Sequence, residues 1–196
     1  MEPCLYMKYD AKGELVGMII VHVDDFQIAG ADWSEDYKAE VDNLKTLYKW
    51  GAEWKSDADG YVCCGVGVSS HEGGGFHLEQ EKYAAGMEQV PIGKANPGDE
   101  IGPNIVAQCR AVIGQCHWLA ANTMPWLSGM VSICQSRLIE ENVKAVQTLS
   151  QVVRMIKQQA GFGMNLHSLK NPTFVTYHDA SWCVRTDLSS QGCFLT

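Results

Sequence analysis

The sequence predicts an α+β fold: a small antiparallel sheet, then a helical segment, then a second pair of strands. Two strand-like regions and one helical region support this prediction. Apolar and β-branched residues dominate 4–30, as in strands, and return at 173–177. Between them, over 105–159, apolar residues recur at the spacing of helices that pack against a core.

An aspartate pair stands in the middle of the first strands. The run 15–23 is almost continuously apolar, which is typical of a strand buried on both faces. Asp24 and Asp25 interrupt the run, and 26–30 resumes it. The pattern therefore predicts a hairpin with both aspartates at its bend, preceded by a strand at 4–9 and a short turn.

A helix is expected after this hairpin. Ser34 can cap its first turn through the hydroxyl group, and Gly51 is expected to end it. Beyond the helix, 60–69 reads as one strand, 73–75 as a turn, and 79–89 as a short helix.

The second half of the chain reads as mostly helical. Residues 90–104 hold three of the six prolines and are predicted to be a linker. Pro125 is placed to open a second helix, and 143–159 forms a third. The third helix is expected to bury a face made of Val146, Leu149, Val153 and Ile156. The strand predicted at 173–177 is followed by a second strand at 192–196.

Composition narrows the class of protein. The chain has 196 residues, of which 46% are hydrophobic, as in a globular protein. Its formal net charge of −8 counts against tight binding of nucleic acid by the chain itself, because phosphate contacts need Lys and Arg. No apolar run approaches the roughly 20 residues of a membrane helix, so no membrane partner is expected.

The eight cysteines are spaced irregularly and form no C-x-x-C motif, which makes a zinc site unlikely on spacing alone. Reduced thiols are expected instead, and with them an intracellular location, cytoplasmic or nuclear. The six tryptophans are interpreted mainly as core or interface residues, although tryptophan can also stack on bases.

The aspartate pair points to a metal ion. Two adjacent carboxylates in a bend between apolar strands repel each other unless a cation neutralises them. Magnesium is the usual cation for carboxylates that also handle phosphates, and two such ions can clamp the oxygens of a phosphoryl transfer.

Several segments together resemble copia-type retrotransposon reverse transcriptases. Segment 21–30 resembles the family's Tyr-x-Asp-Asp hairpin. Four further segments follow in the family's order: 61–68 resembles its Phe-Leu-Gly hairpin, 78–83 its Leu-x-Gln-x-x-Tyr motif, 109–120 its Tyr-Arg-x-x-Ile-Gly helix, and 177–182 the opening strand of its ribonuclease H domain.

The resemblance implies a domain plan. Residues 1–90 would be the C-terminal part of the palm, with a small antiparallel sheet and the Asp-Asp hairpin. Residues 91–104 would be a linker, 105–170 a helical thumb or connection, and 171–196 the truncated start of a ribonuclease H-like α/β domain.

The resemblance also implies an activity and its residues. The parent would be an RNA-directed DNA polymerase that uses Mg²⁺ to add deoxynucleotides to a primer on an RNA or DNA template. Asp24 and Asp25 would be catalytic and bind the metal, with Asp24 the firmer assignment. Asp179 would bind metal in ribonuclease H, and Cys64 and Gly65 would contact nucleic acid in a hairpin that grips the primer.

The sequence departs from the family in ways that leave alternatives open. His22 replaces the usual tyrosine, and 124–126 reads Met-Pro-Trp where the family has Arg-Pro-Asp. The upstream fingers and palm segments and the downstream ribonuclease H segments would be missing partners, so the chain is expected to be inactive alone. The alternatives are a decayed or co-opted remnant that acts as a binding module or has no activity, and an unrelated metal-dependent hydrolase using Asp24, Asp25 and His22.

Overall fold

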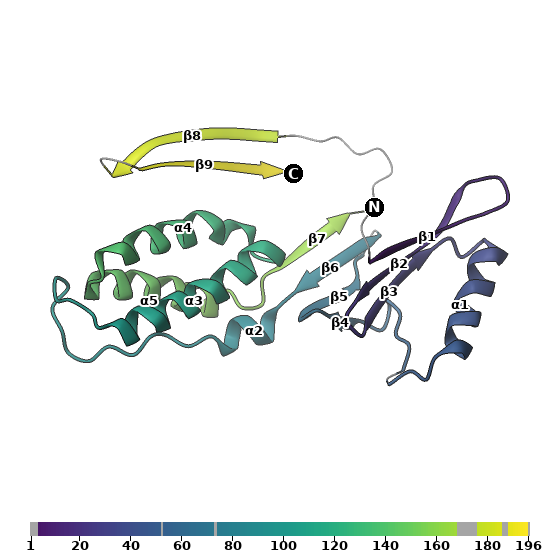
Figure 1. Ribbon diagram of the computed structural model, residues 1–196, viewed down its shortest axis with the longest axis horizontal. Coiled ribbons are helices and arrows are strands. Elements are labelled where there is room, and N and C mark those ends of the chain that lie inside the picture. The colour runs from purple at the N-terminus through teal and green to yellow at the C-terminus, as the bar shows by residue number, and fades with distance from the viewer. Residues whose placement is uncertain (1–3, 52, 73, 168–175, 186–187, 196) are drawn as a thin grey trace. The chain divides into compact units, whose positions relative to one another are not determined.

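The computed structural model describes residues 4–51, 53–72, 74–167, 176–185 and 188–195, with side chains as far as residue 167. Its elements are α-helices and small antiparallel sheets, which confirms the predicted α+β class (Figure 1). The chain divides into two compact units, Met1–Ser69 and Ser70–Thr196, and each is described by itself.

The first unit contains the predicted hairpin in a three-stranded sheet. Strands β1 (Leu5–Tyr9), β2 (Leu15–His22) and β3 (Asp25–Gly30) lie side by side in that order and are antiparallel. Between β1 and β2, the Asp10 carboxylate accepts hydrogen bonds from the backbone N–H groups of Lys12 and Glu14, at 2.8 and 2.9 Å. This is the local capping that favours aspartate in turns.

Helix α1 (Glu35–Leu47) packs on one face of this sheet. The Ser34 hydroxyl accepts a hydrogen bond from the Tyr37 N–H at 3.3 Å, which confirms the predicted cap. The ring of Tyr37 lies over Gly17 and Gly30, which face each other across β2 and β3. The helix ends at Leu47, one turn earlier than the end predicted from the glycine at position 51.

The prediction that β2 is buried on both faces is wrong. Met18 and Ile20 are exposed, whereas Gly17, which alternates with them along the strand, is buried. The reason is that α1 lies over the face that carries Gly17, so Met18 and Ile20 on the other face remain accessible.

The predicted single strand at 60–69 is also wrong, because this segment is a hairpin. Strand β4 (Tyr61–Cys63) turns into β5 (Val66–Ser70) through Cys64 and Gly65, and Cys63 pairs with Val66. Both loop residues have left-handed φ angles, 49° and 77°, as a tight two-residue hairpin loop requires.

The second unit begins with a strand pair that the sequence shows only in part. Strand β6 (Gly75–Glu79) follows the predicted turn, and it pairs with β7 (Gly163–His167), which the sequence did not predict. Helix α2 (Glu81–Gly86) is shorter than the helix expected over 79–89.

A bundle of helices follows the predicted linker. The elements are α3 (Pro103–Asn122), the 3₁₀ turn η1 (Pro125–Leu127), α4 (Ser128–Arg137), the 3₁₀ turn η2 (Leu138–Glu140) and α5 (Val143–Gln158). Asn142 caps α5, accepting a hydrogen bond from the Ala145 N–H at 3.0 Å.

The main hydrophobic core of the described residues lies among these helices. The predicted α5 face is buried, at exposures of 0 to 3%: Val146, Leu149, Val153 and Ile156. One buried polar contact crosses this core, in which the Thr123 hydroxyl donates to the Gln80 side-chain oxygen at 2.9 Å.

A strand pair is present near the two predicted strands, but its bounds differ: the first strand continues to 185 and not to 177, and the second begins at 188 and not at 192, while 173–175 and 196 lie outside the described residues. Strands β8 (Thr176–Arg185) and β9 (Leu188–Leu195) are antiparallel, and Asp179 pairs with Gly192. The side chain of Asp179 lies outside the described residues. In the part of the chain that the structure describes, no helix combines the length and apolarity needed to cross a membrane.

Candidate metal centre

The bend between β2 and β3 is a tight loop of two residues. His22 pairs with Asp25, so only Val23 and Asp24 form the connection. Val23 has a φ of 57° and is 87% exposed. A β-branched side chain rarely adopts this backbone conformation, so the loop holds strain at its first position.

The two aspartates therefore differ in position. Asp24 stands in the loop, Asp25 is the first residue of β3, and both are exposed. Strand β2 ends at His22, so His22 and Asp24 do not belong to one strand. The register places His22 opposite Asp25 instead, where cross-strand side chains lie on one face.

The β4–β5 hairpin brings two thiols together at its own bend. The Cys63 thiol donates a weak hydrogen bond to the Cys64 sulfur, with 3.8 Å between the Sγ atoms. Adjacent residues in a regular strand point to opposite faces. The left-handed conformation of Cys64 breaks this alternation, which lets both sulfurs lie on the same side of the turn.

The two hairpin bends meet. The ligand atoms of Asp25, Cys63 and Cys64 all lie within 4.8 Å of one another. Among the described residues, this is the one group of three or more His, Cys, Asp or Glu side chains close enough to share a metal ion. The structure thus brings together two predicted site residues, Asp25 and Cys64, and leaves Asp24 outside the group.

Cys63 is the member of the group that the sequence did not single out. Burial raises the pKa of its thiol to about 11, helped by the hydrogen bond to Cys64 and by the negative charges of Cys64 and Asp25. Its neighbourhood therefore favours the protonated thiol when no cation is present. The adjacency of Cys63 and Cys64 is visible in the sequence, but no sequence pattern indicates that these cysteines lie close to the aspartates.

An aromatic cluster begins next to Asp25. Phe26 and Trp50 meet edge to face with ring centroids 5.1 Å apart, and Trp50 meets Trp54 in the same way at 5.0 Å. Tyr48 also contacts Trp50, at 5.8 Å. The Lys45 ammonium lies 5.2 Å from the Trp54 centroid, within the range of a cation–π contact.

The interpretation of the tryptophans as mainly core or interface residues holds in part for Trp126, which packs against the core of the second unit. None of the five tryptophans whose side chains the structure describes is buried. Trp54 is 39% exposed and Phe26 is equally so. Rings that keep an accessible face can contact a partner as well as each other.

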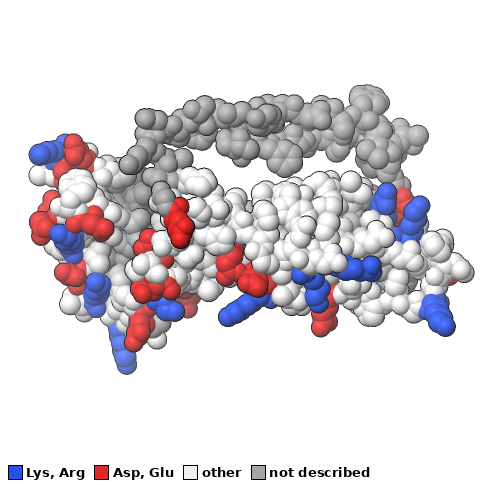
Figure 2. Space-filling model, turned by 180° about the vertical axis from the view of Figure 1, so that it is seen from behind, with Lys and Arg blue, Asp and Glu red and all other residues white. Residues whose placement is uncertain are grey.

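The charged side chains form a mixed surface. On the face drawn in Figure 2, the described Lys and Arg residues are interspersed among Asp and Glu. The whole sequence carries a net charge of −8, so acidic groups outnumber basic ones.

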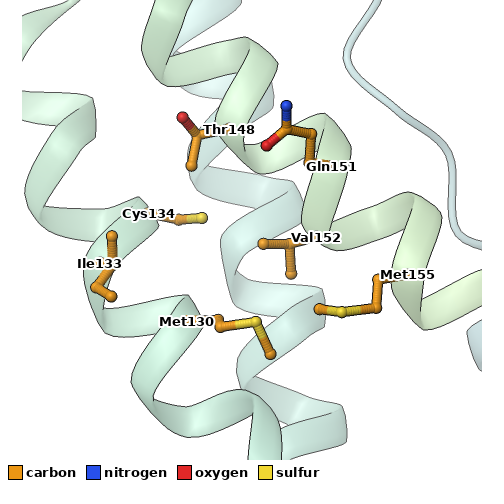
Figure 3. A pocket seen from close by; sticks show the side chains of 7 residues that line it. All are labelled: Met130, Ile133, Cys134, Thr148, Gln151, Val152 and Met155. Atoms are coloured by element: carbon orange, nitrogen blue, oxygen red, sulfur yellow. The ribbon is translucent and has the colours of Figure 1, made fainter.

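Two hollows lie in the second unit and contain none of the predicted site residues. One, of about 290 Å³, lies between α4 and α5, where Met130 and Met155 extend from the two helices (Figure 3). The other, of about 420 Å³, lies beside the linker at Pro91 and Arg154. The first is lined mainly by apolar side chains, with the free thiol of Cys134 and the thioethers of Met130 and Met155 among them.

Compared with protein-family models, curated proteins and solved structures, the chain matches none of them.

Proposed function

We propose that this chain is a palm-containing portion of a copia-type reverse transcriptase. In this proposal, Asp24 at the hairpin bend binds magnesium and Asp25 stands beside it in support. The observation that supports the proposal is the tight Asp-Asp hairpin, with the turn that carries Cys64 and Gly65 placed against it.

The geometry suits a role in nucleotidyl transfer. Magnesium bound there would neutralise the charge that develops on the transferred phosphate. Asp24 stands in a two-residue loop and is exposed, so its carboxylate is free to face a primer end and a deoxynucleotide. The Cys64–Gly65 turn would contact the primer, and the rings of the aromatic cluster offer faces for bases.

The described site supplies fewer carboxylates than a complete two-metal centre needs. Its gathered group contains one carboxylate, that of Asp25, and Asp24 lies beside it in sequence. Such centres hold two ions and both reacting oxygens, which takes several hard oxygen ligands. We infer that catalysis needs a further carboxylate from another segment, and that Asp179 serves a separate ribonuclease H-like site.

A second candidate is a non-catalytic binding module derived from the same family. The net charge of −8 and the presence of one carboxylate, that of Asp25, in the group of candidate ligands favour this module over an enzyme that works alone. The two candidates differ in whether nucleic acid binding depends on magnesium at Asp24.

Binding of a labelled primer–template at low salt, with Mg²⁺ or with a chelator, tests the proposal. We expect weak binding that Mg²⁺ strengthens, and we expect Asp24→Asn to remove the gain. Glu88→Gln, which removes an exposed carboxylate of the second unit, is the matched control and should keep it. Equal binding with and without Mg²⁺, or a gain that survives in Asp24→Asn, would overturn the proposal. Tight binding that resists salt would favour the second candidate.

A further inference from the structure

Two hairpins that are distant in sequence present a mixed set of metal donors. Asp25 offers a carboxylate from the start of β3, and Cys63 and Cys64 offer sulfurs from the end of β4 and its turn. All three ligand atoms lie within 4.8 Å of one another. We propose that Asp25, Cys63 and Cys64 form a binding site for a thiophilic divalent cation, of which zinc is the first candidate.

The distances fit one ion. A tetrahedral zinc with Zn–S bonds of about 2.3 Å holds its sulfurs about 3.8 Å apart. The sulfurs of Cys63 and Cys64 are separated by 3.8 Å. With a Zn–O bond of about 2.1 Å, the carboxylate oxygen would lie about 3.6 Å from each sulfur. The Asp25 side chain can make this approach by a small rotation, because it is exposed.

The donor chemistry selects against magnesium. Thiolates are soft ligands that prefer zinc and related ions, whereas magnesium takes oxygen ligands and keeps its waters. The group therefore differs from the magnesium role proposed for Asp24. The two proposals share Asp25, but the zinc site does not depend on magnesium at Asp24, because Asp24 is not one of its three members.

The backbone preorganises the two sulfurs. Cys64 has a left-handed φ of 49° in a loop closed by the pairing of Cys63 with Val66. Adjacent cysteines in an extended strand would point to opposite faces and could not share an ion. The hairpin thus places the sulfurs together before any metal binds.

The site is open to solvent on one side. Asp25 and Cys64 are exposed, so an ion can enter without local unfolding. Three protein ligands leave the fourth tetrahedral position to water or to another side chain. His22 pairs with Asp25 across the hairpin, but its ring nitrogens are not among the gathered ligand atoms, so water is the expected fourth ligand.

Cobalt is the probe for this site, because thiolate ligands give Co²⁺ a charge-transfer band in the near ultraviolet. We expect reduced, metal-free protein to develop this band with Co²⁺ and to lose it on addition of Zn²⁺. Cys63→Ser and Cys64→Ser should each remove about half of the band and weaken the affinity about tenfold or more. Asp25→Asn should weaken the affinity and keep the band.

Cys4→Ser is the matched control, since Cys4 is an exposed thiol of the same unit outside the group. It should leave the band unchanged. Absence of a band in the unaltered chain, or a full band in the double variant Cys63→Ser with Cys64→Ser, would overturn the proposal.

X-ray absorption by the zinc-loaded, unaltered chain gives an answer that needs no variant to fold. Two sulfurs at about 2.3 Å from zinc are expected, and a shell of oxygen or nitrogen alone would contradict the site. The outcome is separable from the proposed function. A cobalt band without Mg²⁺-dependent nucleic acid binding would contradict the magnesium proposal alone. Mg²⁺-dependent binding without a cobalt band would contradict the zinc site alone.

Discussion

The carboxylate of Asp25 and the sulfur of Cys64 lie within 4.8 Å of each other, although they belong to separate hairpins. This contact joins the bend that carries the aspartate pair to the bend predicted to contact a primer. It also adds Cys63, which changes the chemistry from oxygen donors alone to a mixed oxygen and sulfur set.

The first prediction concerns the reactivity of the two neighbouring thiols in reduced, metal-free protein. Alkylation requires the thiolate, and burial with the nearby negative charges raises the pKa of Cys63 to about 11. We therefore expect alkylation of Cys63 to be slow at pH 8 and to accelerate as the pH rises towards 11. Peptide-resolved mass spectrometry measures the rate at each cysteine.

Asp25→Asn supplies the check on this mechanism. Removing one negative charge should lower the pKa of Cys63, so its rate profile should move to lower pH by a small amount, because burial is the larger cause. The rate at Cys4 should not change. A Cys63 profile that is already at its maximum near pH 8 would contradict the structure.

The second prediction concerns Gly30, over which the Tyr37 ring lies. A methyl group at this position would fall on the ring, so Gly30→Ala should push α1 away from the sheet. We expect a loss of about 1–3 kcal/mol in the stability of this unit, as for an overpacked site. Hydrogen exchange of the α1 amides measures the loss.

Gly51→Ala is the control, because nothing lies within 4 Å of a methyl group built there. Replacing the ring by a smaller side chain, in the double variant Gly30→Ala with Tyr37→Leu, should restore part of the protection of the α1 amides against hydrogen exchange. Unchanged exchange in Gly30→Ala would show that Tyr37 does not lie over this glycine.

The third prediction concerns strain at Val23. Its φ of 57° is costly for a β-branched residue and free of cost for glycine. Val23→Gly should therefore stabilise the hairpin by roughly 1 kcal/mol. Val62 is an exposed residue within β4 and has no left-handed strain to relieve, so Val62→Gly should destabilise its hairpin instead. Denaturant unfolding compares the two, and a loss of stability in Val23→Gly would contradict the left-handed loop.

The fourth prediction concerns the buried contact between Thr123 and Gln80. Thr123→Val keeps the shape of the side chain and removes the donor at 2.9 Å from Gln80. The Gln80 side-chain nitrogen already has no hydrogen-bond partner among the described atoms, so its amide would then be unpaired at both ends. We expect a cost of about 1–3 kcal/mol in thermal unfolding.

Replacing both polar groups gives the matching test. The double variant Thr123→Val with Gln80→Leu should regain most of the stability, because no buried polar group is then left unpaired. If the double variant were less stable than the single one, the contact would not be the reason for the loss.

Much of the fold could be predicted because its signals are local. The Ser34 cap and the buried face of α5 are set by a few neighbouring residues, and the structure confirms them. Composition alone missed the turn at Cys64, because apolar residues flank it on both sides as they would within one strand, whereas the family resemblance implied a hairpin at 61–68. Strand β7 was missed because only its pairing with β6 defines it.

The site was less predictable than the fold for a related reason. Asp24 and Asp25 are adjacent and stand between two apolar runs, and this local pattern was enough to predict the bend between β2 and β3. The approach of Cys63 and Cys64 to Asp25 depends on tertiary packing, which leaves no mark in the order of residues. Spacing along the chain counts against zinc because no C-x-x-C motif occurs, while the three donors that lie together come from two hairpins.

Paramagnetic broadening by Mn²⁺, used in place of Mg²⁺, shows where a hard cation binds in the unaltered chain. We expect loss of amide NMR signals at the β2–β3 bend around Asp24 first, and at the adjoining Cys64–Gly65 turn with it. Asp24→Asn should abolish this broadening, while Cys63→Ser should leave it in place. Broadening centred elsewhere in the chain, or unchanged by Asp24→Asn, would contradict the account.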